Sequence, residues 1–175
     1  MTELDAVATE TDRLFELLNS YQLSPEQLEA GFAEFSAESK NELASRVARR
    51  YEPAPQGGLL ARLLFIQTDA NKADMVTAFL VNLHSPYPDA RKASLYGLEK
   101  LNHPGIVDFA LNSLRDDAGQ VLVAACDILV RKAKEQPQLL GLLKNFHAAH
   151  KDREASYGAV SLLEAHGISS PLAPQ

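Results

Sequence analysis

The sequence repeats a helical hairpin, and this repetition constrains the fold more than any other feature. Residues 88–101 read PDARKASLYGLEKL, and similar small and apolar residues recur 31 and then 34 positions further on. The aligned sets are Ala93, Ser94 and Leu98, then Ala124, Ala125 and Leu129, then Gly158, Ala159 and Leu163. Such a period with two helices per unit predicts a stack of hairpins, each burying its apolar edge against its neighbours.

The helices that precede the first two copies obey the same 31-residue shift, whereas the third copy's first helix, PQLLGLLKNF, does not align position by position. The shift aligns Val76, Leu80 and Leu83 with Val107, Leu111 and Leu114. In the first copy, one helical face is predicted to be buried because its members follow the spacing i, i+3, i+4, i+7, i+8, i+11. These are Ala90, Ala93, Ser94, Gly97, Leu98 and Leu101. We expect close helix contacts to compensate for Gly97 and Gly158, which weaken a helix.

The segment PDARKASLYGLEKL, with its spacing of Asp, Arg, Ala and Leu, resembles the second helix of a HEAT repeat, and the short type found in bilin-lyase-like proteins is the most similar. The resemblance covers residues 72–167, and extends to a degenerate unit within residues 27–67. It departs from the pattern at Leu122 and Ser156, which replace Arg91 in the later units. It implies an all-α chain forming a short right-handed α–α superhelix, with second helices lining the concave surface. The alternative architecture is an irregular helical bundle.

The rest of the chain also favours helices, because period-3.6 patterns recur and no stretch alternates cleanly between apolar and polar residues. Ser24, Pro25 and Gln27 predict a capped helix start. The segment EPAPQGG, residues 52–58, cannot continue a helix and predicts a boundary. The predicted organisation is an acidic helical extension (1–52), a linker (53–58), HEAT-like repeats (59–168) and a flexible tail (169–175).

Acidity is concentrated at the N-terminus: residues 1–40 contain nine acidic and two basic residues. This balance and the absence of tryptophan disfavour nucleic acid as the main ligand. The acidic residues Glu3, Asp5, Glu10, Asp12 and Glu16 are read as a solvated helix face, or as a surface that attracts a basic partner or covers a basic patch of the same chain. With no apolar run long enough for a membrane span and no signal-like start, we expect a soluble, cytoplasmic protein.

Residues beside the buried stripe of the second helices also align between repeats and predict a ladder across the solenoid. Lys92, Val123 and Tyr157 form one row, and Leu95, Cys126 and Val160 the next. The predicted protein-binding residues are Arg91, Lys92, Leu95, Tyr96, Val123, Cys126, Asp127, Tyr157 and Val160. An apolar centre with tyrosine and lysine edges is typical of a protein-binding surface. The alternative is that Leu122, Val123 and Val160 pack against adjacent helices.

No catalytic residue, cofactor site or metal site is predicted. His147 and His150 are spaced to share a metal, but no second motif adds a third ligand, so a surface helix is the preferred interpretation. The di-iron sites of some HEAT-like proteins use His-Glu pairs, and this chain has no His-Glu dipeptide. The single Cys126 has no evident base beside it and is read as a buried, unreactive thiol.

The function predicted from these patterns is a non-catalytic module that binds another protein through the ladder. One alternative, implied by the resemblance alone, is a bilin-lyase-like chromophore lyase or an enzyme accessory subunit. The other is a nucleic-acid-binding HEAT-like protein, which the charge disfavours. The sequence leaves open the partner, the oligomeric state and whether residues 1–52 dock on the repeats.

Overall fold

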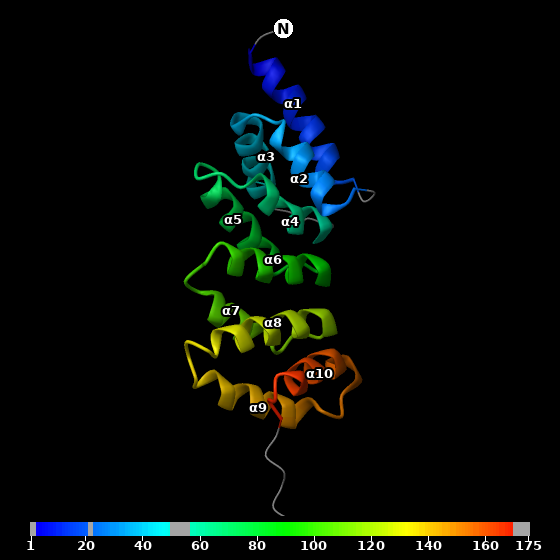
Figure 1. Ribbon diagram of the computed structural model, residues 1–175, viewed down its shortest axis with the longest axis vertical. Coiled ribbons are helices and arrows are strands. Elements are labelled where there is room, and N and C mark those ends of the chain that lie inside the picture. Colours follow the sequence, from blue (N-terminus) through cyan, green and yellow to red (C-terminus); the bar gives the residue numbers. More distant parts are fainter. Residues whose placement is uncertain (1–2, 21–22, 50–56, 170–175) are drawn as a thin grey trace, which may run out of the picture. The chain divides into compact units, whose positions relative to one another are not determined.

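The computed structural model describes residues 3–20, 23–49 and 57–169, and all regular structure within these ranges is helical (Figure 1). This confirms the predicted all-α class. The chain divides into two compact units, residues 1–101 and residues 102–175. The predicted linker at 53–58 lies mostly outside the described residues, but Gly57 and Gly58 belong to a helix and not to a linker. The predicted tail, 169–175, lies outside them except for Ser169.

The N-terminal unit contains six α-helices and one short 3-10 helix among its described residues. The elements are α1 (Glu3–Leu18), α2 (Pro25–Ala33), α3 (Ala37–Arg49), α4 (Gly57–Leu63), η1 (Leu64–Ile66), α5 (Lys72–Asn82) and α6 (Pro88–Lys100). Helix α3 packs on α5 and α4 packs on α6, while α5 pairs with α6. The first helices of successive hairpins, α3 and α5, therefore stack on each other, and so do the second helices, α4 and α6. Helix α1 packs against α3 within the predicted extension (1–52), and α3 packs on α5, so the extension docks on the helices that follow it in this unit.

The C-terminal unit contains two further hairpins. Its elements are α7 (Ile106–Ser113), α8 (Gly119–Lys132), α9 (Leu139–His150), η2 (Glu154–Ser156) and α10 (Tyr157–Ala165). Helix α7 pairs with α8, and α10 lies along α8 as its main neighbour, with α9 packed against both (Figure 1). The second helices of the two hairpins are thus in direct contact, as the repeat predicts.

The predicted buried face of α6 is confirmed, since all six of its members are buried. Gly97 lies on this face because α5 approaches closely there: a Cβ at this position would fall 2.5 Å from ring atoms of Phe79. In the C-terminal unit, a Cβ on Gly158 would fall 3.0 Å from a methyl carbon of Val123. Both glycines therefore permit close helix contact, as expected.

Polar side chains anchor the N-terminal helices to one another. The carboxylate of Glu10 on α1 accepts hydrogen bonds from the backbone N–H of Ser36 at 2.9 Å and from the hydroxyls of Ser36 and Ser39, both at 2.6 Å. These bonds lower the pKa of Glu10 from 4.5 to about 2. Asp12 forms an ion pair with Arg46 of α3 at 2.9 Å. Two of the predicted surface acids thus bind groups of the same chain.

The predicted start of α2 is also confirmed. The Ser24 hydroxyl accepts the backbone N–H of Gln27, and the Gln27 side chain accepts the backbone N–H of Ser24. This capping box satisfies two donors that the first turn of a helix leaves without intrahelical partners.

Candidate functional site

The second row of the predicted ladder is buried. Leu95 and Cys126 are 0% exposed and Val160 is 5% exposed, because each packs into the apolar interior of its own unit. The expectation that this row lines an open groove is therefore wrong. For Leu122 and Val160, the alternative interpretation of packing against neighbouring helices is the correct one, since Leu122 is also only 2% exposed.

The other predicted binding residues reach the surface to different degrees. Arg91, Lys92 and Tyr96 on α6 are half-buried, and the Arg91 guanidinium donates to the Ser85 carbonyl at 2.8 Å. In the C-terminal unit, Val123 is half-buried and Asp127 pairs with Arg131 at 2.6 Å. Tyr157 is 73% exposed, the highest value among the large apolar side chains of the described residues. It begins α10 next to Gly158, and the backbone of Gly158 lies against Val123, so Tyr157 stands at the α8–α10 junction.

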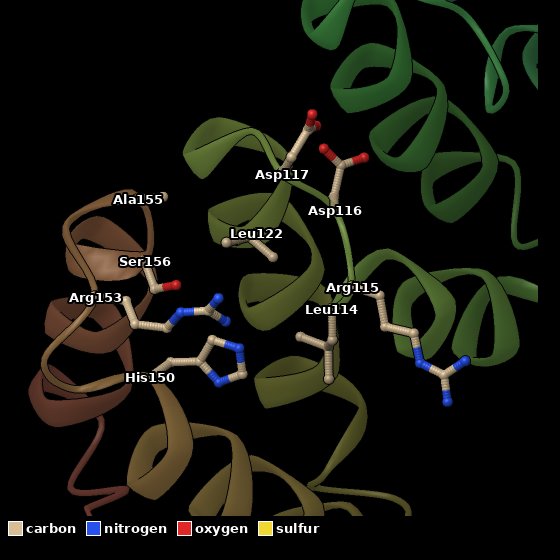
Figure 2. A pocket seen from close by; sticks show the side chains of 9 residues that line it. All are labelled: Leu114, Arg115, Asp116, Asp117, Leu122, His150, Arg153, Ala155 and Ser156. Carbon is tan, nitrogen blue, oxygen red and sulfur yellow. The ribbon is translucent and has the colours of Figure 1, made fainter.

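A pocket of about 480 Å³ opens next to this junction, within the C-terminal unit. Its wall comes from the loop between α7 and α8, the side of α8, the end of α9 and the segment that leads into α10 (Figure 2). The lining residues are Leu114, Arg115, Asp116, Asp117, Leu122, His150, Arg153, Ala155 and Ser156. The segment before α10 can approach α8 because Gly119 has no side chain: a Cβ there would lie 2.6 Å from the Ala155 carbonyl oxygen.

Ser156 is a buried polar residue that points into the pocket. It is 2% exposed and occupies the N-cap position of α10, yet its side chain makes no capping hydrogen bond. Serine at this position ordinarily accepts a backbone N–H of the first helical turn. Figure 2 shows the hydroxyl directed into the pocket, and no described residue forms a hydrogen bond with it. The Ser156 hydroxyl is therefore available to a ligand.

Arg153 and His150 lie beside Ser156 with their nitrogen atoms in the pocket (Figure 2). The His150 ring is held in place by stacking on Phe146, with ring centroids 4.2 Å apart, and by a contact of 3.0 Å between Nδ1 and the Phe146 carbonyl oxygen. That bond makes Nδ1 the donor and leaves Nε2 for a ligand. Arg153 is exposed, and among the described residues its guanidinium has no hydrogen-bonding or ionic partner.

The acidic residues of the pocket lie at its other end. Figure 2 shows the carboxylates of Asp116 and Asp117 directed away from Arg153 and His150. Oδ1 of Asp116 accepts the backbone N–H of Ala118 at 2.9 Å, which fixes the turn before α8. The pocket therefore has a cationic end next to Ser156, whereas its acidic residues, Asp116 and Asp117, lie with Arg115 at the α7–α8 loop.

His147 and Cys126, considered from the sequence for metal binding and reactivity, are both buried. His147 is 5% exposed and its Nε2 lies 2.9 Å from a carboxylate oxygen of Glu164, so the interpretation of HAAH as a surface helix is wrong for this residue. Across the described ranges, no group of three His, Cys, Asp or Glu side chains is placed to hold a metal ion. Cys126 is buried, as predicted, and burial and then the charge of Asp127 raise the pKa of its thiol to about 12, which disfavours the reactive thiolate.

The pocket was not predicted from the sequence. Its lining residues come from four segments between Leu114 and Ser156, and no motif connects them. His150 was considered only as a metal ligand, and Ser156 only as the counterpart of Arg91. The one signal that bears on it is a serine at a helix start that lacks its usual capping geometry, and this is visible only in three dimensions.

Comparisons of the chain with protein-family models, with curated proteins and with solved structures found no match. Of the helices in residues 3–20, 23–49 and 57–169, none has the length and apolar character needed to cross a membrane.

Proposed function

We propose that the protein is a non-catalytic protein-binding module built from stacked, HEAT-like helical hairpins. It binds its partner at the α8–α10 junction of the C-terminal unit. The observation that carries this proposal is the position of Tyr157, which is 73% exposed and stands at the start of α10, directly after the pocket residue Ser156.

A tyrosine in this position suits a protein interface. Tyrosine is enriched among the residues that carry most binding energy, because it buries a large rigid surface and retains a polar group. The pocket beside it offers both apolar side chains, Leu114 and Leu122, and polar groups that can be satisfied by a partner. The bilin-lyase and nucleic-acid alternatives stay predictions from the sequence.

The proposal is tested by comparing two exposed tyrosines in quantitative co-purification followed by mass spectrometry. Tyr157→Ala is expected to lose a partner that the wild-type protein and Tyr87→Ala both retain. Tyr87 is the matched control because it is also exposed, at 47%, but belongs to the N-terminal unit. If every retained protein binds Tyr157→Ala as well as wild type, the junction is not the binding surface. Circular dichroism checks that each variant keeps its helical content.

A further inference from the structure

One end of the pocket in the C-terminal unit is cationic, and the acidic side chains that line the pocket are directed away from it (Figure 2). Arg153 projects its guanidinium there, His150 presents its ring beside it, and Ser156 adds a hydroxyl that no described residue engages (Figure 2). A guanidinium and a hydroxyl both donate hydrogen bonds, and a guanidinium matches the two oxygens of a carboxylate in a bidentate pair.

We infer that this pocket binds an acidic side chain, aspartate or glutamate, of a partner polypeptide. The inference rests on the proposed function, because it names the chemistry of the partner at the same site. The carboxylate would accept hydrogen bonds from Arg153 and Ser156, while Leu114 and Leu122 contact the apolar part of the same segment. Charge complementarity and the Ser156 hydroxyl, which makes no capping bond and faces the pocket, together argue for this occupant.

His150 lines the same end of the pocket with its ring held in one orientation. Its Nδ1 lies 3.0 Å from the Phe146 carbonyl oxygen, so Nε2 is the ring nitrogen left for a ligand. The charged groups that line the pocket are Arg153 on the same side and Arg115, Asp116 and Asp117 along the α7–α8 loop.

The positions of the charged side chains favour an acidic group at the end of the pocket formed by Arg153 and Ser156 and disfavour one at the α7–α8 loop. The carboxylates of Asp116 and Asp117 would repel a second anion, and Figure 2 shows them directed away from the cationic end. Arg115 also lines the pocket, but its guanidinium is directed away from Arg153 and His150 (Figure 2). The control cation is Lys144 on α9, which belongs to the same unit, is exposed and does not line the pocket.

The test uses the full chain and three pools of immobilised random octapeptides, in which one central position is fixed as glutamate, glutamine or lysine. Retention is measured at one pH and one ionic strength for all three pools, because salt screens exposed ion pairs. We expect the wild-type protein to be retained about 1.5-fold to fivefold more strongly by the glutamate pool than by the glutamine pool, the range for an exposed ion pair. Arg153→Gln is expected to abolish this preference and Ser156→Ala to reduce it, while Lys144→Gln, at an exposed position outside the pocket, leaves it intact.

Each other outcome overturns a stated part of the account. Retention of all pools without a preference for glutamate, or a preference that survives in Arg153→Gln, refutes the acidic-partner inference but leaves protein binding standing if Tyr157→Ala weakens retention. Retention by none of the pools refutes the proposed function itself. Free glutarate and inorganic phosphate are added as competitors: if millimolar glutarate or phosphate alone shifts the Arg153 Nε–H resonance while the peptide pools do not, the site binds a small anion and the partner assignment is wrong.

Discussion

Serine side chains serve different purposes in the two units. In the N-terminal unit, Ser24 caps α2, and Ser36 and Ser39 donate to the Glu10 carboxylate. In the C-terminal unit, Ser156 occupies the same N-cap position on α10 but makes no capping bond and turns into a pocket. Ser39 and Ser156 are equally buried, at 0% and 2% exposed. The comparison teaches that burial alone does not reveal a structural role: the decisive question is whether a buried polar group has a partner.

The largest effect is expected at the centre of the N-terminal network. Glu10→Gln removes a charge that accepts three hydrogen bonds, so the free energy of unfolding should fall by about 2–3 kcal/mol at neutral pH. Urea denaturation measures this loss. Glu16→Gln, on the exposed side of the same helix, is the control and should leave stability almost unchanged.

The same residue gives a pH dependence with a defined sign. The pKa of Glu10 is lowered to about 2 in the folded protein, from an ordinary value of 4.5. Its contribution to stability is therefore complete above pH 4.5 and is lost as the pH falls toward 2. The difference in stability between wild type and Glu10→Gln should shrink across this range, and a difference that stays constant would contradict the network.

A smaller effect is expected where two helices of the N-terminal unit touch. Gly97→Ala places a Cβ 2.5 Å from the Phe79 ring, and we expect a net loss of about 1–3 kcal/mol from overpacking. This loss outweighs the roughly 1 kcal/mol that alanine gains over glycine in a helix. Gly141→Ala on α9 is the matched control, because nothing lies within 4 Å of its Cβ and the substitution should stabilise the protein. Phe79→Leu should rescue Gly97→Ala in a double-mutant cycle.

A loss of about 1 kcal/mol is expected from the cap of α2. Ser24→Ala removes the acceptor for the Gln27 N–H, and thermal unfolding should show a lower Tm. Gln27→Ala removes the other half of the capping box and should produce a loss of its own. Unchanged Tm values for both variants would mean that the cap does not hold the helix start.

The sequence predicted those features that depend on local chemistry and on helical period. Ser24 and Pro25 start α2, and the face of Ala93 and Leu98 is buried. The helical period predicted that Leu95 lines a groove, but the side chain is buried. A residue beside the buried stripe can face solvent or its own hairpin, and only the packing of the helices decides which. Gly57 was read as part of a linker, yet it begins α4, which packs on α6.

The candidate site was less predictable, because tertiary approach creates it. His147 shares the buried face of Leu143 on α9 and meets Glu164 of α10, which the metal-ligand spacing of HAAH concealed. The pocket needs the close approach of Ala155 to Gly119, which is a property of a loop and not of a motif. Of the predicted binding residues, Tyr157 is the one that the structure leaves most exposed.

The most direct test of the contrast between the units is the free energy of unfolding of Ser39→Ala and Ser156→Ala, measured side by side by urea denaturation. Ser39→Ala should lose about 1–2 kcal/mol because its hydroxyl donates to Glu10 at 2.6 Å. Ser156→Ala should stay within about 0.5 kcal/mol of wild type because no bond to the protein is lost. Equal losses for the two variants would show that Ser156 supports the fold, and would contradict its availability to a ligand.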